Sequence, residues 1–399
     1  MNSFACRVFQ CCFGAGARLL PWRTPEVYTG DGSLLRVADI LRENGLRRPF
    51  VIASRRQCAD EHFRRLQEVL DMQDILLSIF SAVEPNPSVE TVEKIAEQYR
   101  IDRCDCFLVI GGGSPMDAAK AAAALLVRPN RSLSSLAGLL KVRRRIPPFI
   151  AVPTTAGTGS ETTIAAVITG RDHRKYAVSD LCLIPRYAIL DPTLSAGLPP
   201  HITAETGMDA LTHAVEAYLS RFYNTRKTRE QAERAVVTIF SHLERAYRDG
   251  ASLPDRAAML QASFDAGAAF TRASVGNVHA IAHTLGGLYG TAHGLANAVL
   301  LPIVLEDYGA AAYPRLARLA HLVGIQEASA EASARAFIAE IRAMNARMGI
   351  PDHFDCIRSE DIPLMASWAC REANPVYPVP VIYDQARFAR VIEHSRAEP

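Results

Sequence analysis

The segment FLVIGGGSPMDAAK, residues 107–120, decides the fold of the first half of the chain. Its apolar start, residues 107–110, predicts a buried strand. Residues 111–113 are all glycine, and Pro115 suits the first turn of a helix. A strand that runs through such a turn into a helix presents backbone N–H groups at a helix N-terminus, where a phosphate binds well. Taken alone, the pattern also fits a plain tight turn between strand and helix.

A second loop of the same kind strengthens the phosphate interpretation. Residues 153–161, PTTAGTGSE, follow another apolar run at residues 149–152. The hydroxyls and glycines of this loop offer many hydrogen-bond donors to a diphosphate or a ribose. Two such loops at the carboxyl ends of parallel strands indicate a nucleotide crevice.

Hydrophobic periodicity divides the chain near residue 198. Short apolar runs, including residues 50–53 and 188–190, alternate with helical patterns up to about residue 195. Pro199 and Pro200 interrupt this alternation, and the later sequence is rich in Ala and Leu at helical spacing. We therefore expect an α/β N-terminal dinucleotide-binding, Rossmann-like domain at 1–197 and an all-α C-terminal domain at 198–399, which the ligand pattern described below makes the metal-binding and catalytic domain.

Composition favours a small-molecule substrate. Lys and Arg number 44 against 42 Asp and Glu, so no strong field attracts nucleic acid or an anionic membrane. No run of eighteen apolar residues exists. Nine cysteines without a C-x-x-C pair suggest the reducing cytoplasm. The first 23 residues are mildly apolar, but Arg7 and Gln10 interrupt them, which argues against a cleaved signal.

The second half carries a metal-ligand pattern. Asp209 and His213 are four residues apart in one predicted helix, and His279 and His283 are four apart in another. Each pair therefore shares a helix face, and His293 follows ten residues later. A single histidine is more often an ordinary core or surface residue, but the joint pattern favours a metal site. Imidazoles with one carboxylate suit Fe²⁺, Zn²⁺, Co²⁺ or Ni²⁺ better than Mg²⁺ or Ca²⁺.

Together these motifs resemble the iron-containing, or group III, alcohol dehydrogenase family. The resemblance covers nearly the whole chain, through residues 30–33, 84–87, 111–120, 153–161, 191–192, 207–218 and 279–302. It implies that the metal ligands are Asp209, His213, His279 and His293. It also implies that His283 is catalytic, beside the nicotinamide and substrate in a proton relay.

The resemblance further implies a set of cofactor contacts. They come from the glycine loop with its following Asp, from the Thr-Thr pair and from three scattered positions: Gly112, Gly113, Ser114, Asp117, Thr154, Thr155, Asn86, Val167 and Lys175. NAD-preferring relatives carry an Asp after the first strand, whereas this chain has Ser54 followed by two arginines. We expect Ser54 to contact the cofactor and NADP(H) to be preferred over NAD(H). In the alternative interpretation, Arg55 and Arg56 are solvated surface residues and the enzyme tolerates both cofactors.

The implied reaction is reversible hydride transfer between an alcohol and NAD(P), with Fe²⁺, or alternatively Zn²⁺, as Lewis acid. The resemblance suggests a homo-oligomer such as a dimer. Phe270 could line the substrate pocket or belong to the core. The role of residues 374–380, which differ from the commoner family ending, stays open.

Three other functions compete with this interpretation. A sugar-phosphate lyase or synthase would need basic residues for the phosphate, and residues 276–302 contain no Lys or Arg. A metal-independent maleylacetate-type reductase would not need the intact ligand set. A nucleotide-sensing or scaffold protein would bind cofactor without turnover.

Overall fold

The computed structural model describes residues 3–171 and 175–397. It contains two compact units. One unit is Pro21–Gly197, and the other joins Met1–Leu20 to Leu198–Pro399. The expected domains and these units differ in the first twenty residues, which group with the helical unit instead of the α/β unit.

A six-stranded parallel sheet forms the centre of the α/β unit, in the order β1-β9-β6-β4-β2-β3. The expected strands are all present, within one residue at each end. The strand bounds are β1 Glu26–Thr29, β2 Pro49–Ile52, β3 Ser78–Phe80, β4 Cys106–Gly111, β6 Phe149–Pro153 and β9 Tyr187–Leu190.

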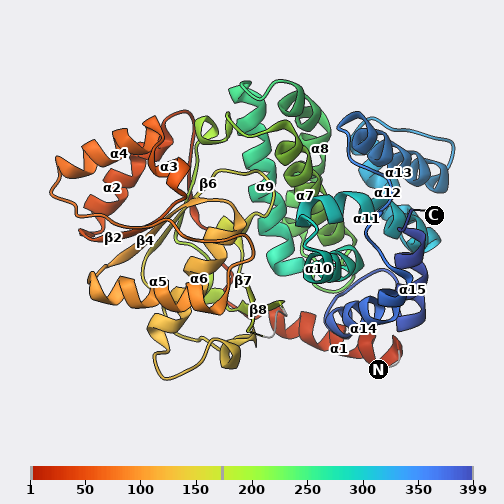
Figure 1. Ribbon diagram of the computed structural model, residues 1–399. Coiled ribbons are helices and arrows are strands. Elements are labelled where there is room, and N and C mark those ends of the chain that lie inside the picture. The colour runs from red at the N-terminus through yellow and green to blue at the C-terminus, as the bar shows by residue number, and fades with distance from the viewer. Residues whose placement is uncertain (1–2, 172–174, 398–399) are drawn as a thin grey trace. The chain divides into compact units, whose positions relative to one another are not determined.

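Helices cover both faces of this sheet (Figure 1). They are α2 Arg36–Glu43, α3 Arg55–Cys58, α4 Glu61–Asp71, α5 Val89–Ile101 and α6 Gly113–Val127. Alternate strand residues face opposite ways: Phe107 and Val109 join the core under α5 and α6, whereas Leu108 joins the core under α2 and α4. Because both faces of the sheet are covered, the inner strands β2, β4, β6 and β9 are buried and mostly apolar, as the sequence indicated, whereas the edge strands β1 and β3 are partly exposed.

A second, three-stranded sheet was not expected from the sequence. It has the order β5-β8-β7, where β5 is Gly138–Leu139, β7 is Ala165–Thr169 and β8 is Lys175–Ser179. β7 and β8 pair antiparallel, which places Val167 opposite Ala177. Two of the expected cofactor contacts, Val167 and Lys175, therefore lie on this small sheet.

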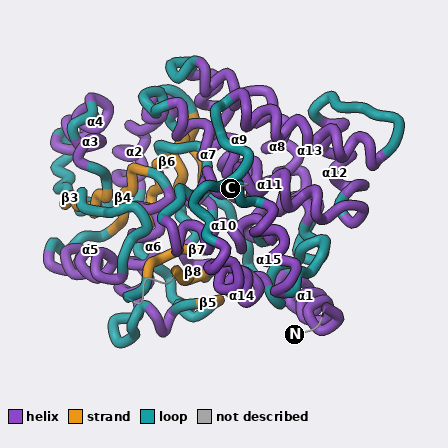
Figure 2. Tube along the Cα trace, turned by 45° about the vertical axis from the view of Figure 1, so that its right-hand side comes forward, coloured by secondary structure: helices purple, strands orange, loops and turns teal. Residues whose placement is uncertain are grey.

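The other unit is helical (Figure 2). Its helices are α1 Ser3–Ala17, α7 Pro200–Leu219, α8 Arg226–Arg248, α9 Leu253–Ala273, α10 Asn277–Tyr289, α11 His293–Tyr308, α12 Tyr313–Leu322, α13 Ala330–Arg347, α14 Ile362–Ala373 and α15 Gln385–His394. Among its described residues no strand forms, apart from one isolated bridge between Phe354 and Arg396. α7 begins at Pro200, at the break that the two prolines predicted. The expected fold class, a parallel α/β region and an all-α region, is confirmed.

Helix α1 lies against the segment before α15. Arg7 donates to the carbonyls of Val379 and Pro380, and Gln10 donates to those of Pro375 and Tyr377. The two polar residues that interrupt the apolar N-terminal run therefore donate to partly buried backbone oxygens. No described helix is long and apolar enough to cross a membrane.

Candidate metal and cofactor sites

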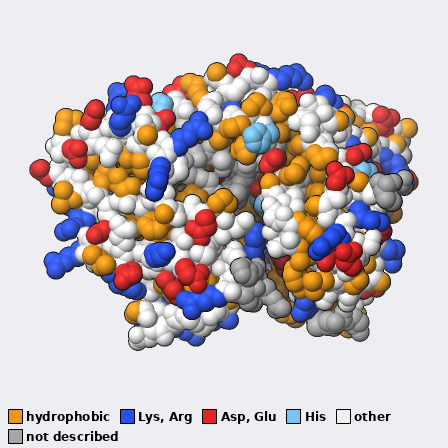
Figure 3. Space-filling model, viewed as in Figure 1, with side chains coloured by type: hydrophobic (Ala, Val, Ile, Leu, Met, Phe, Trp, Pro, Cys, Tyr) orange, Lys and Arg blue, Asp and Glu red, His pale blue; other side chains and the backbone are white. Residues whose placement is uncertain are grey.

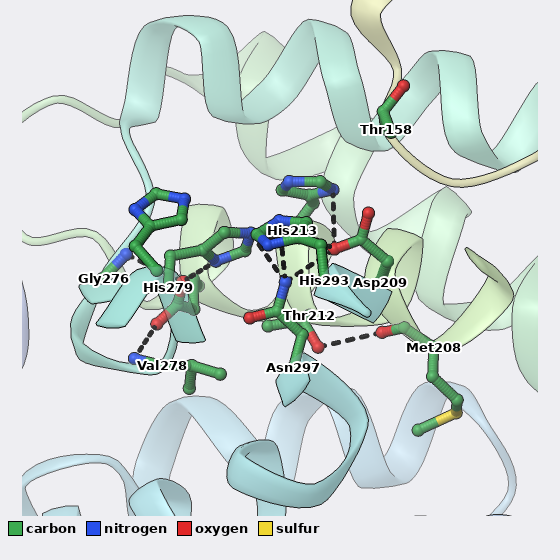
Figure 4. A network of polar contacts seen from close by, with 12 residues as sticks. Thr158, Met208, Asp209, Thr212, His213, Gly276, Val278, His279, His293 and Asn297 are labelled. Carbon is green, nitrogen blue, oxygen red and sulfur yellow. Dashed lines mark hydrogen bonds and ion pairs between the residues drawn. The ribbon is translucent and has the colours of Figure 1, made fainter. Parts of the chain in front are cut away.

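Three helices of the helical unit bring the expected metal ligands together. Asp209 and His213 lie on α7, His279 lies on α10, and His293 begins α11. One ligand atom from each residue can be chosen so that all four lie within 4.8 Å of one another. Oδ1 of Asp209 is 3.8 Å from Nε2 of His279 and 3.6 Å from Nε2 of His293 (Figure 4). Three imidazoles and one carboxylate are a donor set that suits Fe²⁺ or Zn²⁺.

Asn297 shows that these atoms converge on one point. Its Nδ2 lies 2.7 Å from Oδ1 of Asp209, 3.2 Å from Nε2 of His279 and 3.1 Å from Nε2 of His293. An amide nitrogen has two hydrogens and cannot satisfy three acceptors. Lone pairs from three sides thus meet at one electropositive group, the arrangement that a divalent cation requires. Asn297 lies one turn after His293 on α11, so i,i+4 spacing could have identified it.

A buried carboxylate orients His279. Nδ1 of His279 is 2.6 Å from Oε2 of Glu216. The backbone N–H of Gly276 donates to the same oxygen at 2.8 Å, and the backbone N–H of Val278 donates to Oε1, also at 2.8 Å. The proton therefore stays on Nδ1, and Nε2 keeps its lone pair for the metal. Burial raises the pKa of Glu216, and the backbone N–H groups of Gly276, Val278 and His279 lower it, because they stabilise the carboxylate.

Glycine is required beside this carboxylate. A Cβ on Gly276 would lie 2.7 Å from Oε1 of Glu216, so a side chain there would push the carboxylate away. Glu216 falls seven residues after Asp209, on the same face of α7, which is a signal that the sequence analysis did not use.

Phe270 of α9 lies against the cluster. Its ring stacks on the imidazole of His213 with centroids 4.1 Å apart. Half-buried, Phe270 contacts a candidate ligand directly, which favours a wall of the site over a purely structural core position.

His283 stands one turn beyond His279 and is outside the group of four. Its ring stacks on His293 with centroids 5.3 Å apart. Nδ1 of His283 is 2.6 Å from Oε1 of Glu372 on α14, and the Tyr377 hydroxyl donates to the same oxygen at 2.7 Å. The segment of open role, residues 374–380, thus supplies a tyrosine to the hydrogen bonds behind His283. No sequence pattern pointed to Glu372, which is 89 positions from its partner.

In the α/β unit, three neighbouring strands end beside one another, because β2, β4 and β6 are adjacent in the sheet. The glycine loop follows β4, the threonine-rich loop follows β6, and Ser54 follows β2. A Cβ on Gly112 would lie 3.1 Å from Oγ1 of Thr155, and one on Gly113 would lie 2.9 Å from Cγ2 of Thr158. A side chain at Gly113 would therefore force Thr158 to shift, so this glycine permits the close contact between the two loops.

Asp117 links α6 to the threonine-rich loop and to β7 through hydrogen bonds. Its carboxylate accepts from the Ser160 hydroxyl at 2.8 Å and from the Val167 N–H at 3.0 Å. Buried Lys120, one turn later, donates to the carbonyls of Ser160 and Thr163 at 2.6 and 2.9 Å. Both Asp117 oxygens therefore already receive internal hydrogen bonds, which makes Asp117 a support of the loops. Lys120 lay in the glycine-loop motif, but its role was missed.

The other expected cofactor residues form small local groups. Lys175 Nζ donates to Oδ1 of Asn86 at 2.8 Å, and the Asn86 N–H donates to Oγ of Ser114 at 3.3 Å. The Thr154 hydroxyl accepts from Nε2 of Gln57 at 3.1 Å. Ser54 is the N-cap of α3 and forms a capping box with Gln57.

Comparison with known proteins identifies the family of the chain. The sequence matches the family described as iron-containing alcohol dehydrogenase over residues 24–192, and the C-terminal family of Fe-containing alcohol dehydrogenases over residues 203–392. It is 40% identical to the 1,3-propanediol dehydrogenase of Klebsiella pneumoniae, covering 75% of this chain and 78% of that one. It is 32% identical to the NAD-dependent methanol dehydrogenase of Bacillus methanolicus, covering 88% and 94%.

A solved structure of 1,3-propanediol oxidoreductase superposes with a TM-score of 0.89, at 33% identity, covering 95% of this chain and 100% of that chain. Family matches to both halves, together with a similar structure over nearly the full length, leave one conclusion. The chain belongs to the iron-containing alcohol dehydrogenase family and is an NAD(P)-linked oxidoreductase that acts on CH–OH groups.

Proposed function

We propose that Asp209, His213, His279 and His293 hold one Fe²⁺ ion and that the enzyme interconverts small primary alcohols and aldehydes. The convergence of three acceptor atoms on Nδ2 of Asn297 carries this proposal, because one cation in that region would face all of them. Such a cation supplies Lewis acidity toward the oxygen of an alcohol or carbonyl substrate. The names of the relatives make 1,3-propanediol and methanol the first substrates to test.

The chain's own residues keep these donors available. Burial and the nearby imidazoles lower the pKa of His279 well below its usual value, so the ring stays neutral. Hydrogen bonding to Glu372 fixes the proton of His283 on Nδ1 and leaves Nε2 as an acceptor. His283 is the catalytic proton carrier in this proposal, and Glu372 is its positioning residue.

The function is tested by loading the purified protein anaerobically with Fe²⁺ or with Zn²⁺ and assaying a panel of alcohols and aldehydes with NAD and NADP. We expect one metal ion per chain and turnover that disappears on chelation and returns with Fe²⁺. Turnover that survives removal of all bound metal would favour the maleylacetate-type alternative. Cofactor binding without turnover on any substrate would favour the sensing alternative.

The cofactor preference is a separate proposal, for NADP(H). It rests on the absence of an acidic residue at position 54 and on the exposed arginines that follow, which can bind a 2′-phosphate. The relative named as NAD-dependent makes NAD the competing expectation.

Ser54→Asp tests the preference without removing the helix cap, because Asp is also a good N-cap residue. We expect kcat/KM to shift toward NAD by roughly 1–3 kcal/mol. Ser54→Asn, a neutral cap of similar size, is the matched control and should leave the preference nearly unchanged. A wild type that already favours NAD tenfold, about 1.4 kcal/mol, contradicts the proposal.

Two further expectations complete the proposal. All nine cysteines are free, which supports a cytoplasmic location. A homo-oligomer such as a dimer is the expected assembly, and light scattering of the purified protein tests it.

A further inference from the structure

The α/β unit contains a cavity of about 570 Å³ that none of the functions above uses. Five arginines line it: Arg23, Arg143, Arg144, Arg145 and Arg186. This volume lies in the range of small-molecule sites.

The positive charge of this cavity is not balanced by carboxylates. Asp180 is the only acidic residue in its lining, and its two oxygens accept the backbone N–H groups of Val142, Arg143 and Cys182. Within residues 3–171 and 175–397, none of the five arginines forms an ion pair. Elsewhere arginines form ion pairs with acidic residues, as Arg171 does with Glu90. Figure 3 shows a face of the molecule on which basic and acidic side chains are interspersed.

Several of the guanidinium groups are already held in place. Arg23 donates to the carbonyls of Ile184 and Pro185, and Arg144 donates to that of Val127. Arg186 lies over the ring of Tyr187, 5.1 Å from its centroid. Each guanidinium has five N–H donors, so most donors remain for a ligand. Positioned arginines lose little side-chain entropy when they bind an anion.

The cavity lies away from the cofactor loops within this unit. Arg186 directly precedes β9, Arg23 lies three residues before the start of β1, and residues 143–145 precede β6. These strands are neighbours in a parallel sheet, so the arginines gather where the strands begin. The glycine and threonine loops follow the opposite, carboxyl ends of the strands. A ligand here would therefore not occupy the nucleotide crevice.

We propose that this arginine-lined cavity is a second ligand site, for a small metabolite that carries two phosphate groups. Guanidinium groups bind phosphate oxygens in pairs, and five of them around one cavity match two dianionic groups better than one. A nucleic acid or a membrane would call for an extended basic surface, whereas these exposed arginines all line one pocket.

Calorimetric titration of the metal-loaded enzyme tests this site, with saturating NADP(H) present to fill the cofactor loops. Fructose 1,6-bisphosphate is the probe, glucose 6-phosphate is the single-phosphate comparison, and fructose is the blank. We expect saturable binding of the bisphosphate, weaker binding of the monophosphate and none of fructose. Arg145→Gln/Arg186→Gln should weaken bisphosphate binding by roughly 10-fold or more, because two charged donors are lost.

Arg64→Gln/Arg65→Gln is the matched control, since it removes two exposed arginines of α4 that do not line the cavity. In this control, the dissociation constant for fructose 1,6-bisphosphate should stay within about twofold of the wild-type value. Arg145→Lys keeps the positive charge but loses the paired N–H donors of the guanidinium group, so its affinity for the bisphosphate should lie between those of the wild type and the double variant. This single variant provides the test if the double variant does not fold. No saturable binding by the wild type, or an equal loss in the control, overturns the proposal.

Discussion

Two histidines lie one turn apart on α10, each hydrogen-bonded to a carboxylate from another helix, and the two pairs differ in burial. Both have an Nδ1-to-carboxylate distance of 2.6 Å. The side chains of His279 and Glu216 are each 2% exposed, whereas those of His283 and Glu372 are 25% and 33% exposed. Glu216 receives two further backbone N–H groups, whereas Glu372 receives a tyrosine hydroxyl.

Under the proposed function, the same kind of hydrogen bond supports two uses. In both pairs the hydrogen bond to the carboxylate places the ring proton on Nδ1, so that Nε2 is the acceptor nitrogen. Deep burial lowers the pKa of His279 and keeps its ring neutral, the form that the proposed metal ligand needs. Partial exposure at His283 leaves a path for a proton to reach solvent, as a proton carrier needs.

Replacing each histidine in turn gives the largest expected effect. His279→Ala should release the metal and lower kcat/KM by at least roughly 10²–10³-fold, because one ligand and its charge stabilisation are lost. His283→Ala should keep one metal per chain and still lose turnover. Metal analysis together with steady-state kinetics measures both.

If His279→Ala retained the metal and His283→Ala lost it, the roles of the two histidines would have been assigned the wrong way round.

Glu216→Gln should have the next largest effect. The amide keeps the volume of the side chain but turns an NH₂ group toward the N–H donors that now surround the carboxylate. We expect metal affinity to fall by about 10–100-fold, as for other residues that orient a ligand. Competition with a metal chelator measures the affinity. Unchanged affinity would mean that Glu216 only stabilises the fold.

Glu372→Ala should change rate more than metal binding. Without the carboxylate, His283 loses the partner that fixes its orientation, so we expect kcat to fall by roughly 10-fold while metal content stays constant. Glu372→Gln keeps an oxygen acceptor for Nδ1 and should recover part of the rate. A change in KM alone, or equal rates for the two variants, would contradict a positioning role.

Tyr377→Phe should have the smallest effect of the series. It removes one hydrogen bond to Glu372 and keeps the carboxylate and the ring, which is a loss of about 0.5–1.5 kcal/mol. We expect kcat to fall by less than in Glu372→Ala. The double variant with Glu372→Ala should be no slower than Glu372→Ala alone, because the tyrosine acts through Glu372. A further additive loss in the double variant would show an independent role.

Local sequence determined much of this protein. The apolar run at residues 107–110 became β4 within one residue at each end, and the glycines after it begin α6 as expected. The four-residue spacing of Asp209 and His213 placed both on one face of α7. These features follow from local rules, since strand burial, helix periodicity and turn chemistry act over a few residues.

Tertiary structure alone decided which distant groups meet. Asn297 faces three candidate ligands from three helices, Glu372 reaches His283 across 89 positions, and α1 binds the backbone near Pro380. No local pattern encodes such contacts, because they depend on how helices pack once their apolar faces are buried. The sequence therefore determined the elements and the type of chemistry, while packing decided which carboxylate orients each histidine and how much water reaches it.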